Sequence, residues 1–179
     1  MIEIAQQAGE ILRVGFGQHH QVEFKGEIDL VTEIDHRSEE LILGEIGKRF
    51  PDHAAFSEES GERSGSAEDI WYVDPLDGTL NYSHGLPFFC VSIAYAHKGR
   101  FTFGAVYDPI AEEMYTAENG KGARLNGKPI HASAVAELKS SLWSPVSLTM
   151  RGPTQSTISQ SFNAFPCERR ACGGWARRP

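Results

Sequence analysis

Three neighbouring strand-like segments, joined by turn signals, constrain the fold of this chain more than any other feature. The segments are 88–96, 101–107 and 113–118, and the turn signals are Lys98-Gly99, Asp108-Pro109 and Asn119-Gly120. Short turns between consecutive strands join antiparallel neighbours. We therefore predict a sheet that is antiparallel for much of its extent.

Helical patterns precede these strands. Apolar residues recur on one face of segment 2–16, and a second helix is expected from Asp35, its N-cap, to before Pro51. Other expected elements are an extended segment 22–32, short strands 53–56 and 70–73, and a polar, mobile loop 61–69. Helices followed by a run of strands predict an α+β fold with layered helices and sheet, rather than regular βαβ alternation.

The charge balance excludes several classes of partner. The 179-residue chain has 24 acidic and 17 basic side chains, a net charge of -7. This argues against general affinity for nucleic acid or an anionic membrane surface. No apolar run approaches the roughly 20 residues that span a bilayer. Three unevenly spaced cysteines do not form a disulfide framework, so we expect a reducing, cytoplasmic environment.

An acidic set carries the strongest chemical signal. Asp74 follows an apolar strand, and Asp77 lies three residues later, across an expected tight turn, with Glu58 upstream. Crowded carboxylates stay ionised only with cations among them, and hard oxygen ligands favour Mg²⁺ or Mn²⁺ over zinc. Gly78 permits close backbone approach to a ligand, and Thr79 adds a hydroxyl and an amide at a helix start. A phosphate ester bridging such metals is a natural substrate.

The segment from Asp74 to Tyr82 resembles the signature of the inositol monophosphatase family, part of a lithium-sensitive, magnesium-dependent phosphatase superfamily. Further segments stand in the order that family shows: 29–32 with Asp35, 57–60, 87–93, 104–107 and 120–123. The resemblance covers residues 1–142. It implies the layered helix/sheet sandwich of the inositol monophosphatase/fructose-1,6-bisphosphatase type, and a homodimer is also a family expectation.

The resemblance also implies a set of metal ligands. Glu58, Asp74 and the main-chain carbonyl of Leu76 would hold a first Mg²⁺, and Asp74 and Asp77 a second. Glu58 would help to place a third ion. Two or three Mg²⁺ ions are therefore expected, with Mn²⁺ as the alternative metal.

Substrate and water are assigned by the same resemblance. The amides of Gly78 and Thr79, beside Asp77, would bind the phosphate of a small phosphate ester. Glu58 and Thr79, with Asp35 behind the threonine hydroxyl, would orient the attacking water. Lys25 is either a residue near a first-site loop or an ordinary solvated lysine.

The C-terminal part departs from the family pattern. The family carries a Trp-Asp-x-Ala-Ala motif whose aspartate completes the second metal site, and this sequence contains no Trp-Asp pair. Residues 151–179 hold five arginines against one acid. We expect a metal-binding domain at 1–142 and an atypical basic tail at 143–179. Our hypothesis is a truncated or frame-disturbed product with an exposed apolar sheet face and weak or no activity.

Two functional interpretations stay open. The first is a phosphomonoesterase, with segment 79–82 favouring inositol monophosphate over nucleotide 3'-phosphates, fructose bisphosphate or histidinol phosphate. The second is a non-catalytic module that binds metal or phosphate, or pairs with another subunit. The missing second motif favours the module, and the complete first motif favours the enzyme.

Overall fold

The computed structural model describes residues 1–18, 22–24 and 30–136. The chain divides into two compact units, Met1–Ser133 and Ala134–Pro179, and the fold below is that of the first. The predicted domain boundary at 142, the tail 143–179 and Lys25 all lie outside the described residues. These expectations stay predictions.

The described residues of the first unit form three helices, α1 (Ile2–Gly15), α2 (Glu33–Arg49) and α3 (Thr79–Ser83). The two long helices agree with the predicted ones. The predicted N-cap of α2 is wrong, because the helix begins at Glu33 and Asp35 lies inside its first turn. The Asp35 carboxylate instead meets the hydroxyl of Thr79, a contact across 44 residues that local pattern does not reveal.

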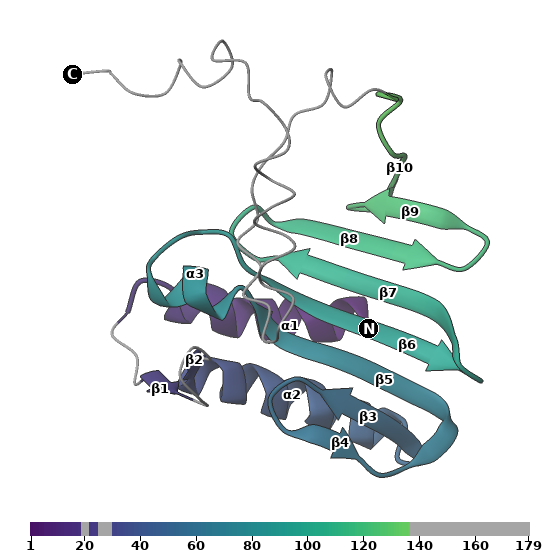
Figure 1. The fold of residues 1–179 in the computed structure, drawn as a ribbon, viewed down its shortest axis with the longest axis horizontal. Helices are drawn as coiled ribbons and strands as arrows, with labels where there is room; N and C mark the ends of the chain where they lie inside the picture. The colour runs from purple at the N-terminus through teal and green to yellow at the C-terminus, as the bar shows by residue number, and fades with distance from the viewer. Residues whose placement is uncertain (19–21, 25–29, 137–179) are drawn as a thin grey trace, which may run out of the picture. The chain divides into compact units, whose positions relative to one another are not determined.

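Eight strands form one mixed, mostly antiparallel sheet, in the order β10-β9-β8-β7-β6-β5-β3-β4 (Figure 1). Their bounds are β3 (His53–Ser57), β4 (Gly61–Arg63), β5 (Ser66–Asp77), β6 (Cys90–His97), β7 (Arg100–Asp108), β8 (Glu113–Glu118), β9 (Gly122–Leu125) and β10 (Lys128–Ile130). Among the strands of the described residues, only β3 and β5 pair in parallel. A separate antiparallel pair joins β1 (Val22–Phe24) to β2 (Leu30–Thr32). The α+β class and the antiparallel meander are confirmed.

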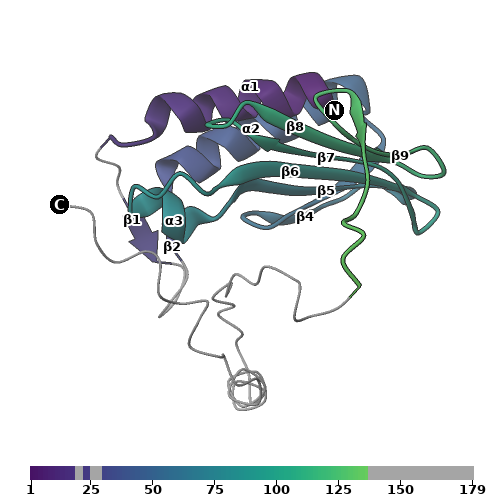
Figure 2. The same cartoon turned by 90° about the horizontal axis from the view of Figure 1, so that it is seen from above.

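The core lies between the long helices and one face of the large sheet (Figure 2). Buried residues from both layers fill it: Ala5, Ala8, Leu12, Ile42 and Ile46 from the helices, and Trp71, Val73, Val91, Ile93 and Ala105 from the sheet. Because successive strand side chains alternate between faces, Tyr72 points away from this core. Tyr72 and four other large side chains, Phe56, Phe101, Val106 and Tyr115, are 37–62% exposed.

Two local expectations are wrong. The segment predicted as a mobile loop forms β4 and the start of β5, since Gly61, at φ 80°, reverses the chain and β4 pairs with β3. The expected tight turn between Asp74 and Asp77 is instead extended strand with a β-bulge, because Asp74 pairs with Ser92 while Asp77 pairs with Cys90. The bulge places one extra residue on β5 between Asp74 and Asp77.

No helix within the described part of the chain is long and apolar enough to cross a membrane.

Candidate active site

The site lies where β3 and β5 end. Because these strands run parallel, their carboxyl ends meet at the same edge of the sheet. Glu58 follows β3 directly, and its backbone N–H donates to the carbonyl of Val73 on β5 at 3.0 Å. Asp74 comes next on β5. The topology thus brings together two predicted ligands that are 16 positions apart in the sequence.

The side chains of Glu58 and Asp74 line the same depression at this edge of the sheet. Burial raises the pKa of Asp74 well above its usual range, and a hydrogen bond to Glu58 and the negative charges of Glu58 and Asp77 raise it further. The Leu76 N–H donates to Asp74 Oδ1 at 3.2 Å and opposes this shift in pKa. Two carboxyl groups in contact need either a shared proton or a cation between them. The pair therefore fits a cation site.

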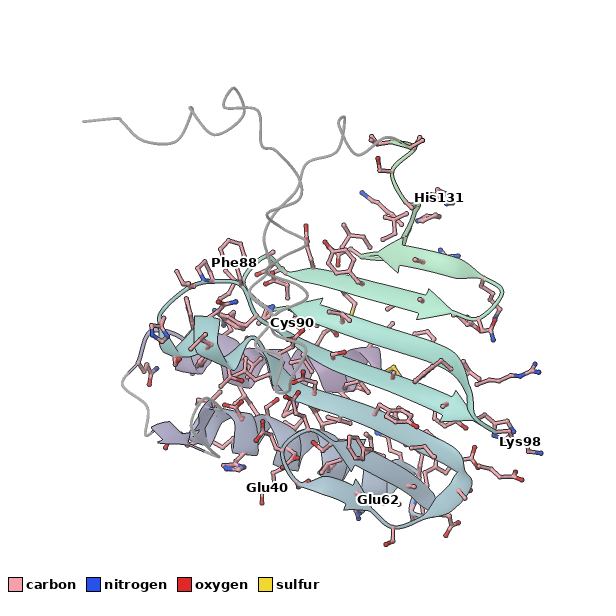
Figure 3. The ribbon with its side chains drawn as sticks, in the orientation of Figure 1. Glu40, Glu62, Phe88, Cys90, Lys98 and His131 are labelled. Carbon is pink, nitrogen blue, oxygen red and sulfur yellow. The ribbon has the colours of Figure 1, made fainter. Side chains whose placement is uncertain are left out.

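Asp77 lies at the edge of this pair. Its carboxylate Oδ2 is 3.7 Å from Sγ of Cys90, the paired residue on β6, labelled in Figure 3. Burial, followed by the charges of Asp77 and Asp74, raises the pKa of the Cys90 thiol to about 12, so the group stays protonated. In the ranges 1–18, 22–24 and 30–136, no three His, Cys, Asp or Glu side chains are gathered as metal ligands. The three-carboxylate centre stays a prediction.

The Thr79 hydroxyl joins the site to helix α2. Thr79 Oγ1 lies 3.1 Å from Oδ1 of Asp35 and 3.0 Å from the carbonyl oxygen of Leu76. Asp35 has no exposed surface. The predicted placement of Asp35 behind the threonine hydroxyl agrees with this geometry. The Leu76 carbonyl has two lone pairs, so the contact with Thr79 leaves one for another partner.

Gly78 forms the corner between β5 and α3. Its backbone is left-handed (φ 95°, ψ 32°), and a Cβ there would lie 2.7 Å from the carbonyl oxygen of Phe88. That oxygen accepts a hydrogen bond from Asn81 Nδ2 at 2.8 Å. Buried Tyr82 fixes α3 to α1 by donating to the carbonyl of Leu12 at 2.8 Å. The positions of the Gly78 and Thr79 amides are therefore set by packing on both sides.

Sequence reasoning missed two residues of α2. Ser38 donates to the carbonyl of Pro75 at 2.8 Å, and Glu39 Oε1 accepts from the N–H of Ser60 at 2.9 Å. Both side chains are buried. Their spacing is the signal that could have found them. Residues three and four positions after Asp35 lie on the same face of the helix as Asp35.

An open depression of about 440 Å³ adjoins the carboxylate pair. Its lining is Phe56, Glu58, Tyr72, Val73, Asp74, Ser92 and Ala94. The lining combines two carboxyl groups with apolar side chains and Ser92. The ligand chemistry suits a hard divalent cation such as Mg²⁺.

Known proteins are similar to this chain in sequence. A family model described as the inositol monophosphatase family matches residues 1–176. "Inositol monophosphatase 1" of Solanum lycopersicum is 44% identical over 98% of this chain and 67% of its own length. "Nus factor SuhB" of Escherichia coli K12 is 41% identical over 76% of this chain and 52% of its own length.

Solved structures give the same result. The extragenic suppressor protein suhB of Bartonella henselae superimposes with a TM-score of 0.74 at 40% identity, covering 75% of this chain and 54% of its own. An IMPase of Thermotoga maritima gives a TM-score of 0.70 at 39% identity, covering 74% of this chain and 52% of its own. The chain thus spans between about half and two thirds of these relatives' lengths.

Proposed function

Because the chain belongs to the inositol monophosphatase family, we propose that its site serves magnesium-dependent hydrolysis of a small phosphomonoester, with inositol monophosphate as the leading substrate. The observation that carries this proposal is the placement of Glu58 and Asp74 at the ends of two adjacent parallel strands, where both line one depression. Two neighbouring carboxylates repel each other when both are ionised, and a divalent cation between them would neutralise this repulsion.

The proposed ligands are Glu58, Asp74, Asp77 and the carbonyl of Leu76, for two or three Mg²⁺ ions or, alternatively, Mn²⁺. When bound, the metal would supply the positive charge that activates water and stabilises the phosphate oxygens. In this structure Asp77 Oδ2 lies 3.7 Å from Sγ of Cys90.

The remaining roles belong to the chain's own groups. The Thr79 hydroxyl, 3.1 Å from the buried Asp35 carboxylate, would orient the attacking water together with Glu58. The backbone amides of Gly78 and Thr79 would bind the phosphate, beside Asp77. Asp35 then acts as the acceptor that fixes the direction of the threonine hydroxyl.

The substrate assignment rests on segment 79–82, which resembles the inositol monophosphatase branch of the superfamily. This resemblance favours inositol monophosphate over fructose bisphosphate or nucleotide 3'-phosphates. Attack of water on phosphorus would break the P–O bond to the alcohol and release inorganic phosphate. We extend the proposal to a homodimer, to lithium sensitivity and to a reducing cytoplasm, the last in keeping with the free thiol of Cys90.

A non-catalytic role is the second candidate. The chain spans about half the length of curated relatives such as Nus factor SuhB of Escherichia coli, and several relatives carry that name rather than a phosphatase name. Among the described residues, no three His, Cys, Asp or Glu side chains are gathered as metal ligands. In this candidate the site binds metal or phosphate without turnover.

Phosphate release from inositol monophosphate separates the two candidates. We would measure it with Mg²⁺ and with a chelator, for the native chain, for Asp77→Asn and for Glu118→Gln, an exposed control on β8. Magnesium-dependent release that only Asp77→Asn abolishes supports the phosphatase. A folded native chain that releases no phosphate favours the non-catalytic candidate.

A further inference from the structure

We propose that Glu39 is a positioning residue of this site, acting through the backbone N–H of Ser60 to hold Glu58 opposite Asp74. The inference rests on the proposed function in taking Glu58 as a metal ligand. Glu39 itself would touch neither metal nor substrate.

Helix α2 presents three buried polar side chains on one face. Asp35, Ser38 and Glu39 occupy positions i, i+3 and i+4, and their exposed fractions are 0%, 0% and 7%. The core side of a helix normally carries apolar residues, since a buried polar group without a partner is costly. Three consecutive positions of this kind on one face therefore need a reason.

Each of the three side chains contacts a different backbone or side-chain group of the site. Asp35 meets the Thr79 hydroxyl, Ser38 donates to the Pro75 carbonyl, and Glu39 accepts from the Ser60 N–H. The Pro75 contact holds β5, which carries Asp74 and Asp77, and the Thr79 contact holds the start of α3 just after β5. The Ser60 contact holds the turn after β3, which contains Glu58. Helix α2 thus contacts both segments that carry the proposed ligands.

The turn that contains Glu58 is fixed at both ends. Ser57 pairs with Gly61, and residues 58–60 connect them. At the start of this turn the Glu58 N–H donates to Val73 of β5 at 3.0 Å, and at its end the Ser60 N–H donates to Glu39 at 2.9 Å. Removing the Glu39 contact removes one of the contacts that hold this turn, and Glu58 gains freedom relative to Asp74.

Glu39 and Ser60 line a second depression beside helix α2. His36, Glu40, Leu43 and Arg63 line the shallow depression that Glu39 and Ser60 share. The Arg63 guanidinium donates to the Leu43 carbonyl at 3.1 Å, toward the helix backbone. A carboxylate that accepts from a backbone N–H makes a stronger hydrogen bond than a neutral acceptor does.

The test compares variants of Glu39 in the full chain. Glu39→Leu keeps the bulk and loses the acceptor, whereas Glu39→Gln keeps an acceptor oxygen without the charge. Ile46→Val, at the buried far end of the same helix, is the control for lost stability. The affinity for Mn²⁺, measured by electron paramagnetic resonance on folded samples, is compared with the unfolding midpoint and with amide exchange at Ser60.

We expect Glu39→Leu to weaken Mn²⁺ binding about 10-fold or more, the range for groups that support a metal ligand. Exchange at the Ser60 amide should speed up in the same variant. Glu39→Gln should restore most of both properties, and Ile46→Val should leave the affinity unchanged. If Glu39→Leu does not fold, Glu39→Asp, which retracts the carboxylate by one methylene, takes its place with the same expectation.

Native Mn²⁺ affinity in a folded Glu39→Leu or Glu39→Asp variant would overturn the inference. So would a Glu39→Gln variant that binds no better than Glu39→Leu. A native chain that binds no Mn²⁺ removes the proposed metal site itself, and this failure is seen in the native protein before any variant is compared.

Discussion

Thr79 Oγ1 lies 3.1 Å from Oδ1 of Asp35, a carboxylate with no exposed surface on a helix that precedes Thr79 by 44 residues. The same hydroxyl is 3.0 Å from the Leu76 carbonyl. The orientation of one hydroxyl therefore depends on both α2 and β5. The threonine that would orient water is held by groups far apart in the sequence.

Replacing Asp35 by Asn tests this relationship. The substitution keeps an oxygen of similar position but removes the charge that draws the Thr79 proton. We expect phosphate release to fall about 100-fold, the lower range for a positioned proton-transfer group. Thr79→Ser retains the hydroxyl and should keep most of the rate. An Asp35→Asn variant with the native rate in a steady-state phosphate assay would contradict the assignment.

Gly78→Ala should destabilise the fold. The residue has φ 95°, and an added Cβ would lie 2.7 Å from the Phe88 carbonyl oxygen. A left-handed conformation costs a residue with a Cβ roughly 1–2 kcal/mol, before any clash is counted. Urea unfolding would give the change in the free energy of unfolding.

Gly44→Ala is the matched control. Gly44 lies inside α2 with open space around its Cα, and Ala in a helix interior is favoured over Gly by about 0.5–1 kcal/mol. The two glycines should therefore respond with opposite sign. Equal stability of the two variants would show that Gly78 is not constrained as described.

Asp69 gives a pH-dependent contribution to stability. Hydrogen bonds from Tyr95 (2.6 Å), the larger cause, and from His97 (2.7 Å) lower the pKa of Asp69 from 3.8 to about 2. A carboxyl with a lower pKa in the folded state stabilises the fold above its unfolded pKa. This contribution is lost as the pH falls from about 4 toward 2.

The measurement compares the native chain with Asp69→Asn by urea unfolding between pH 2 and pH 6. The native advantage should be constant above about pH 5 and should shrink between pH 4 and pH 2. A difference between the two proteins that does not change over this window would contradict the lowered pKa.

Local sequence patterns predicted the elements better than the contacts between them. Turn signals at Lys98-Gly99 and Asn119-Gly120 separated the meander strands, and the structure has both turns, each with a Gly at positive φ. The parallel pairing of β3 with β5 brings Glu58 to Asp74 and has no local signal. The family resemblance, in contrast, predicts that these two carboxyls lie close together.

The errors have physical causes of the same kind. Segment 61–69 is polar and glycine-rich, yet backbone pairing with β3 makes part of it strand. Asp35 has the chemistry of an N-cap, but it lies one turn too deep in α2 and binds Thr79 instead. The sequence does not predict Ser38 and Glu39 as site residues, because they bind backbone groups, the carbonyl of Pro75 and the N–H of Ser60.

The most direct test of the proposed site is a crystal of the chain grown with millimolar Mn²⁺ and measured at the manganese absorption edge. We predict an anomalous peak coordinated by the carboxylates of Glu58 and Asp74, with the Leu76 carbonyl in the same shell. A well-ordered site without a manganese peak, or a peak only elsewhere on the molecule, would contradict the assignment of this carboxylate pair as the metal centre.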